Sequence, residues 1–304
     1  MTFTTRIKEE ITLYKPDTLS ARIILLSYLK YASIIENNKY SIIIENANIA
    51  RFIYRLIKMT YNINVNLTIR MQKKFKMKKM FILSFNEKIN DINLDINELQ
   101  NTIKDSSFEE ISSYIKGVFI CAGSINDPSK NKYHLEFLLD NEDDSILINN
   151  LLRTIELSSK IIKRDKGYMV YIKSSEEISD FIKILGATNS LFYYEDIRIY
   201  RDHKNMVNRL NNCEQANIEK SMKSSHEQIE NINYIKEHDL IDLLDDKIRI
   251  VIEYKEKYPE TTMNELAYII SLETDIKITK SGINHYFRKI KDLVNKDKNR
   301  ENKE

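Results

Sequence analysis

Two helical stretches of this chain carry small residues at matching positions, and this repeat limits the folds that the chain can adopt. The stretches read SYLKYASII, residues 27–35, and SSYIKGVFICAGSIND, residues 112–127. The matching positions are Ser27, Ala32 and Ser33 in the first and Gly117, Ala122 and Gly123 in the second. Small residues let two helix backbones approach closely, so we expect the two helices to pack against each other across a pseudo-two-fold axis.

The elements around the two helices are predicted to repeat in the same order. A short helix over Thr4–Tyr14, stopped by Pro16, comes first. The first repeat is predicted as a helix Thr18–Ala32, strands Ser33–Glu36 and Tyr40–Ile44 turning at Asn37 and Asn38, a helix capped by Asn46 and running to Tyr61, strands Val65–Met71 and Lys79–Phe85, and an acidic helix near Ile89–Ile103. In the third strand, Leu67 and Ile69 alternate with Thr68 and Arg70, which is typical of a half-buried strand.

The second repeat follows the helix that ends at Gly123. Its predicted elements are strands 124–126 and His134–Leu139, a helix Asn141–Leu157 with acids in its first turn, strands Ser159–Arg164 and Tyr168–Lys173, and a helix Glu176–Leu185 that ends at Gly186. The spacing therefore predicts the order αββαββα twice.

The pattern changes after Tyr200. Residues 205–234 are polar and compatible with a helix, with Met206, Leu210 and Cys213 on one stripe, and they form either a linker helix or a half-ordered segment. The last part of the chain is predicted to be compact and helical. It contains a helix Asp246–Lys257, a break at Pro259, a helix opened by the capping box Thr262–Glu265, and a third helix capped by Thr279 that buries Ile283, Phe287, Ile290 and Val294.

Three stretches carry a resemblance to a known family: AGSINDPSKNKYHLEF, RIYRDHKNMVNRLNNCEQANIEKS and TKSGINHYFRKI. GVFICAGSI resembles the signature helix of the LAGLIDADG homing endonucleases, and nearly the whole chain resembles the bacterial WhiA family. The resemblance implies an α+β fold, with a two-repeat LAGLIDADG-like body followed by an all-α helix-turn-helix domain. The expected division is a body over 1–200 with repeats at about 17–104 and 108–200, a linker helix over 201–235, and a helix-turn-helix domain over 236–304.

The signature helices lack the acids of the nucleases. In those enzymes each helix ends in an acid before its last glycine, and the paired acids hold divalent metal. Here Ala32 and Ala122 stand at these positions, and the nearest carboxylates, Glu36 and Asp127, are not equivalent, because Asn126 matches Glu36. We therefore expect a structural seam and no catalytic residues. The alternative is a residual endonuclease, which would nick DNA with magnesium and gain activity from Ala32→Asp or Ala122→Asp.

The third C-terminal helix carries the strongest functional signal. Residues 277–300 hold eight basic and two acidic side chains, and a helix-turn-helix places such a helix in the major groove. Ser281, Asn284 and His285 are expected to contact base edges. Lys280, Arg288 and Lys289 are expected to contact phosphates. The full predicted set is Thr279, Lys280, Ser281, Asn284, His285, Arg288, Lys289 and Lys291. The alternative is a small helical bundle with a solvated charged face.

Two further basic groups are candidates for secondary DNA contact. The first is the ribbon Arg70, Lys73, Lys74, Lys76, Lys78 and Lys79, and the second is Arg198, Arg201 and Arg209. The alternative for the ribbon is a solvated loop, because a chain rich in Ile, Asn, Lys and Tyr indicates an AT-rich genome that supplies lysines without selection for them.

Several kinds of chemistry find no support in the sequence. The formal net charge is +2, the two cysteines are far apart, and no CxxC, HExxH or Gly-rich phosphate loop is present. Cys121 and Cys213 are expected to be buried thiols in a reducing cytoplasm. The start lacks the apolar segment of a signal peptide, and no run of 18 apolar residues occurs. We expect a cytoplasmic, nucleoid-associated protein without metal, cofactor or membrane contact.

The resemblance also implies a function. Related proteins control transcription, linked to sporulation in some bacteria and to cell division and chromosome segregation in others. We therefore expect a non-enzymatic regulator whose partners are double-stranded DNA and the transcription machinery or another regulator. A third hypothesis makes the body a platform for docking proteins, with DNA contact secondary. The oligomeric state stays open.

Overall fold

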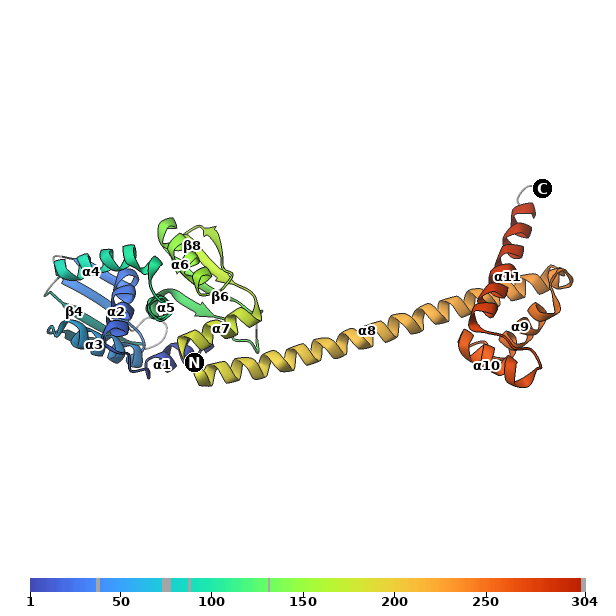
Figure 1. The fold of residues 1–304 in the computed structure, drawn as a ribbon, viewed down its shortest axis with the longest axis horizontal. Helices are drawn as coiled ribbons and strands as arrows, with labels where there is room; N and C mark the ends of the chain where they lie inside the picture. The colour runs from blue at the N-terminus through green and yellow to red at the C-terminus, as the bar shows by residue number, and fades with distance from the viewer. Residues whose placement is uncertain (37–38, 73–77, 87–88, 131, 302–304) are drawn as a thin grey trace. The chain divides into compact units, whose positions relative to one another are not determined.

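The computed structural model describes residues 1–36, 39–72, 78–86, 89–130 and 132–301. The chain forms two compact units, Met1–Asp202 and His203–Glu304. Figure 1 draws the first from blue to yellow-green and the second from yellow to red. The predicted turn at Asn37 and Asn38 lies outside the described residues.

The first unit contains the order αββαββα twice, as predicted. The first repeat comprises α2 (Thr18–Ala32), β1 (Ser33–Glu36), β2 (Lys39–Ile44), α3 (Ala47–Tyr61), β3 (Asn66–Gln72), β4 (Lys78–Phe85) and α4 (Ile89–Thr102), with the 3-10 turn η1 (Ile103–Asp105) after it. The second repeat comprises α5 (Phe108–Ala122), β5 (Gly123–Ile125), β6 (Leu135–Leu139), α6 (Glu142–Thr154), β7 (Lys160–Arg164), β8 (Gly167–Ile172) and α7 (Ser175–Leu185).

Each repeat builds one antiparallel sheet, and the two sheets have equivalent strand orders. The first runs β1-β2-β4-β3 and the second β5-β6-β8-β7. Buried side chains face each other across both central strand pairs, as Ile42 does with Leu83 and Phe137 with Val170. The helices are set by the caps that the sequence indicated: Asn46 accepts from the backbone of α3, and Gly186 ends α7 with φ +74°.

The helices α2 and α5 form the expected seam between the repeats. A Cβ on Gly117 would lie 2.0 Å from Ser27 Oγ and 2.4 Å from the carbonyl oxygen of Ile24, so the backbones touch here. Ile24, Ile115 and Val118 are fully buried around this contact. The two small-residue positions that matched in sequence therefore meet in space.

The helix α1 (Phe3–Ile11) joins the two repeats, although it belongs to neither. Thr4 Oγ1 donates to the carbonyl of Ile125 in the second repeat, and Asn46 Nδ2 in the first repeat donates to Glu9. The helix ends at Ile11, three residues earlier than predicted. It ends there because Leu13 and Tyr14 donate to carbonyls three residues back, which makes a tighter turn than an α-helix.

The third strand departs from its predicted half-buried pattern. Leu67 and Ile69 pair with Leu83 and Phe81, so they point to the core face of the sheet. Their side chains are nevertheless 53% and 56% exposed. The reason is that β3 is the edge strand, beyond the cover that α3 gives to the central strands.

The predicted change of pattern at Tyr200 does not end a helix. A single helix α8 (Thr188–Glu237) runs for 50 residues, which is possible because its sequence contains neither Gly nor Pro. Cys213 lies on its exposed surface and not in a core, which corrects the prediction, whereas Cys121 on α5 is partly buried. No helix among the described residues is both long and apolar enough to cross a bilayer.

Candidate nucleic-acid interface

The second unit holds the candidate interface on a small helical core. It consists of the end of α8, the 3-10 turn η2 (Leu240–Leu243), α9 (Asp246–Lys257), α10 (Met263–Glu273) and α11 (Lys280–Glu301), drawn orange to red in Figure 1. The four residues predicted to anchor α11 are buried: Ile283, Phe287, Ile290 and Val294. They pack with Ile232 and Ile235 of α8, which lie in the stretch predicted as linker.

The turn between α10 and α11 is held by local hydrogen bonds. Thr262 and Glu265 form the predicted capping box at the start of α10. Ser271 Oγ donates to the carbonyl of Ile278 at 3.3 Å and accepts from its N–H at 3.2 Å. Thr279 Oγ1 accepts from the N–H of Gly282 at 3.3 Å and caps α11. Three short-range contacts thus fix the direction in which α11 leaves the turn.

The solvent face of α11 presents three of the predicted residues together. Ser281, His285 and Arg288 are spaced by four and three residues, which puts them on one side of a helix, opposite the buried stripe. All three are exposed. Within the described structure Arg288 makes no ion pair, so its guanidinium is available to an anion.

The other predicted residues of α11 lie at its flanks. Thr279 and Lys280 are exposed, and Asn284 is half-buried. Two lysines are already paired inside the unit: Lys289 Nζ lies 3.5 Å from Asp245 Oδ2, and Lys291 Nζ lies 2.5 Å from Glu227 Oε1 on α8. Because these pairs are exposed, each contributes little to stability.

The secondary basic groups divide into three kinds. Arg70 and Lys79 are exposed on β3 and β4, and Arg209 is exposed on α8. The side chains of Lys73, Lys74, Lys76 and Lys78 lie outside the part of the chain that the structure describes. The remaining two are used within the first unit. Arg198 pairs with Glu195 at 2.8 Å, and Arg201 donates to the carbonyl of Pro128 at 2.7 Å and lies over the ring of Tyr133.

The two positions that carry the metal-binding acids in the nucleases lie at the ends of the two seam helices. Ala32 is the last residue of α2 and Ala122 the last of α5, and each is partly buried against the core. Asp127, the nearest acid of the second repeat, accepts hydrogen bonds from Ser129 and Tyr193. Among the described residues, no three His, Cys, Asp or Glu side chains gather as a metal site would require.

Sequence reasoning missed one basic residue of this unit. Lys255 on α9 is 2% exposed, and it lines a pocket with Lys280. Its spacing was a usable signal, because Ile248, Val251, Ile252 and Lys255 follow each other by three, one and three residues and so share the buried stripe of α9.

Taken together, the two-repeat body and the helical unit define the class of protein that joins a LAGLIDADG-like fold to a helix-turn-helix domain. Three family models match the chain: the WhiA N-terminal LAGLIDADG-like domain at residues 20–97, the WhiA LAGLIDADG-like domain at 111–204 and the WhiA C-terminal HTH domain at 207–294. The chain belongs to the WhiA family.

Relatives match over almost the full chain. Proteins named "Probable cell division protein WhiA" from Bacillus cereus (strain AH187) and Bacillus anthracis (strain CDC 684 / NRRL 3495) are each 37% identical over 309 residues, which cover 97% of this chain and 97% of the relative. Among solved structures, the full-length DUF199/WhiA protein from Thermatoga maritima superimposes with a TM-score of 0.56 and 21% identity, over 97% of this chain and 99% of that one. This likeness shows the fold.

Proposed function

We propose that this chain is a non-enzymatic regulator that binds double-stranded DNA through α11 and acts in transcription control connected with cell division and chromosome segregation. The observation that carries the proposal is the exposed face of Ser281, His285 and Arg288, standing on a packed helical core with no internal partner for Arg288 among the described residues. Ser281, Asn284 and His285 would reach base edges near the start of the helix.

Phosphate contacts in this proposal come from the flanks of α11. Thr279 and Lys280 lie at its N-terminus, and Arg288, Lys289 and Lys291 follow along it. Positive charge beside a groove supplies most of the affinity and little of the sequence preference. Arg70, Lys79 and Arg209 are proposed as weaker contacts. Arg198 and Arg201 would have to give up their contacts within the first unit before they could join them.

The absence of catalysis is also part of the proposal, and it rests on Ala32 and Ala122 at the ends of the seam helices. An alanine side chain offers no oxygen to a cation. Relatives are named as cell division proteins, which supports the cellular role proposed for this chain. We further propose that it works in the cytoplasm at the nucleoid, with the transcription machinery or another regulator as partner.

Binding to labelled genomic fragments tests the proposal directly. The full chain is titrated by fluorescence anisotropy at several salt concentrations, beside Arg288→Ala and Arg51→Ala. Arg288→Ala should weaken binding by roughly 5- to 30-fold and reduce the slope of log affinity against log salt by about one. Arg51 is an exposed residue of α3 with the same charge, and its loss should change little. The proposal would be contradicted if the affinity for DNA did not change with salt concentration, or if both variants changed that affinity equally.

Mapping on the chromosome tests the regulatory part. Immunoprecipitation of bound DNA should give discrete sites for the native chain, and Arg288→Ala combined with Lys289→Ala should lose them. Transcripts next to these sites should change in the same variant. Uniform occupancy with unchanged transcripts would argue against a regulator.

A second candidate, a protein-docking platform, is favoured by apolar side chains on the outer sheet faces. Ile34 and Ile43 are 49% and 46% exposed on the side of the first sheet opposite to Ile42, and Leu138 is 58% exposed on the second sheet. Exposed apolar groups of this kind are typical of protein contacts. A chain ending at residue 244 distinguishes the candidates in cells that lack the native gene: restored division supports docking, and failure supports DNA binding.

A further inference from the structure

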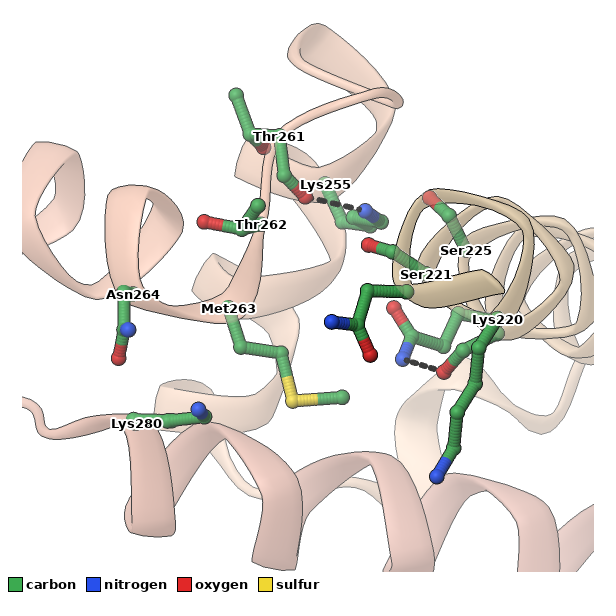
Figure 2. A pocket seen from close by; sticks show the side chains of 12 residues that line it. Lys220, Ser221, Ser225, Lys255, Thr261, Thr262, Met263, Asn264 and Lys280 are labelled. Carbon is green, nitrogen blue, oxygen red and sulfur yellow. Dashed lines mark hydrogen bonds between the residues drawn. The ribbon is translucent and has the colours of Figure 1, made fainter. Parts of the chain in front are cut away.

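The second unit contains a pocket between α8, α9, the start of α10 and the start of α11, shown in Figure 2. Its volume is about 430 Å³, which is within the usual range of pockets for small ligands. The lining includes the lysines Lys220, Lys255 and Lys280 and no acidic residue. A pocket with three cations and no carboxylate is a site of positive potential.

Lys255 is the residue that makes this pocket unusual. It is 2% exposed, and its Nζ donates one hydrogen bond, to the carbonyl of Thr261 at 3.0 Å. Within the described structure no carboxylate pairs with it, whereas Lys257, two residues further on, lies 3.4 Å from Glu273. Burial lowers the pKa of Lys255. A buried ammonium costs free energy unless an anion and further acceptors accompany it.

Neutral donors surround this buried ammonium. Gln228 on α8 is 9% exposed and donates to Ser224 Oγ at 3.1 Å. Ser221 and Ser225 line the same wall, and both are labelled beside Lys255 in Figure 2. The hydroxyl of Ser221 and the second N–H of the Gln228 amide can donate hydrogen bonds to the oxygens of an anion, whereas the hydroxyl of Ser225 already donates to the carbonyl of Pro259.

The start of α10 completes the pocket. Thr262, Met263 and Asn264 line it, so the positive end of the α10 dipole lies beside the pocket. The capping box occupies the backbone N–H groups of Thr262 and Glu265, so the donors that this helix start offers to a ligand are side chains such as Asn264. Lys280, the first residue of α11, lies on the opposite side of the pocket in Figure 2. Residues from four helices, α8, α9, α10 and α11, therefore line one volume.

We propose that this pocket binds a phosphate group, with Lys255 as its buried counter-charge and Lys220 and Lys280 at its rim. Two sources offer this chemistry: a phosphate of the DNA backbone, in which case the inference rests on the proposed function, and a diffusible phosphate ester, in which case it does not. A pocket lined by residues from four helices, with a buried ammonium that no carboxylate pairs with among the described residues, fits either source. An uncharged ligand would leave the lysine unpaired.

The first experiment uses inorganic phosphate and the full chain. The melting temperature is followed as phosphate rises, against sodium chloride at matched ionic strength. A saturating rise with phosphate alone is expected. Lys255→Met should abolish it, and Lys247→Met, an exposed lysine of the same helix, should keep it. The proposal fails if sodium chloride raises the melting temperature as much as phosphate does, or if the melting temperature of Lys255→Met still rises with phosphate.

A second variant removes any dependence on the folding of Lys255→Met. Asn264 is exposed in the first turn of α10, where Asp is a favourable residue, so Asn264→Asp should fold at least as well as the native chain. Its new carboxylate should repel the ligand and lower phosphate affinity by roughly tenfold. An unchanged affinity would contradict the assigned pocket.

Competition between phosphate and DNA separates the two sources. If the pocket takes a backbone phosphate, Lys255→Met weakens DNA binding and phosphate competes with DNA beyond its ionic strength. If it takes a diffusible ester, Lys255→Met loses the phosphate response and keeps native DNA affinity. A chain that binds phosphate through Lys255 and no DNA at all would sink the proposed function and leave the pocket standing.

Discussion

Gly117 on α5 lies directly against Ser27 on α2, so that a single added carbon at Gly117 would come within 2.0 Å of Ser27 Oγ. The contact is the centre of the pseudo-two-fold seam. The carbonyl oxygen of Ile24 lies 2.4 Å from the same point, which means that shortening Ser27 alone would not make room. The seam is therefore set by backbone against backbone.

Gly117→Ala is expected to destabilise the first unit by roughly 2–4 kcal/mol, because the helices must move apart and lose their packing. Gly282→Ala is the matched control. A Cβ there would have its nearest neighbours at 3.4 and 3.7 Å, and the exchange removes backbone freedom from the unfolded chain, so its effect should be neutral or stabilising. Urea unfolding measures both. Equal stability of Gly117→Ala and the native chain would refute the close seam.

Lys8 makes the stability of the first unit depend on pH. Its ammonium is partly buried over the ring of Phe119, and burial lowers the pKa of Lys8 from 10.5 to about 8. Between these two values the unfolded chain binds more protons than the native chain, so this residue's contribution to the free energy of unfolding rises with pH. Below pH 8 both states carry the proton, and the cost of burial is felt in full.

Lys8→Met should therefore be more stable than the native chain at pH 7, by roughly 1–3 kcal/mol. This advantage should shrink between pH 8 and 10. Lys15→Met, at an exposed position seven residues further along the chain, should show no such trend. Denaturant unfolding of all three proteins across pH 6–10 measures the difference, and an advantage that grew with pH would contradict the assignment.

Phe287→Ala should unfold the second unit and leave the first intact. Phe287 is 6% exposed in the helical core, and its truncation should cost about 3–5 kcal/mol. A unit with so small a core has little stability to lose. Calorimetry should show one transition moving down in temperature and DNA binding lost with it. Phe287→Leu, which keeps most of the volume, should retain binding; a uniform shift of every transition would show that the units do not melt separately.

The native chain should leave supercoiled plasmid uncut with magnesium or manganese, because Ala32 and Ala122 cannot bind a cation. Gel electrophoresis over a day detects nicking. The Asp127→Asn variant separates the chain's own activity from a contaminating nuclease. Metal-dependent nicking that disappears in this variant would restore the endonuclease hypothesis.

The sequence determined the elements that depend on neighbours along the chain. Small residues marked the seam between α2 and α5. The ends of helices were marked by Asn46, Gly186 and Thr262. The double αββαββα order followed from the spacing of the predicted elements. These features depend on backbone freedom and capping, which act over a few residues.

Only the tertiary structure decided which side chains have partners. Lys291 pairs with Glu227, 64 positions away in sequence, and Arg201 donates to the carbonyl of Pro128. Basic residues that look alike in the sequence therefore differ in whether a partner within the protein already holds them. Leu67 is exposed because its strand lies at a sheet edge. Lys255 is buried although it is charged, and it lines one pocket together with residues of α8. Burial and charge pairing arise from residues far apart in the chain, and no local pattern fixes which of them will meet.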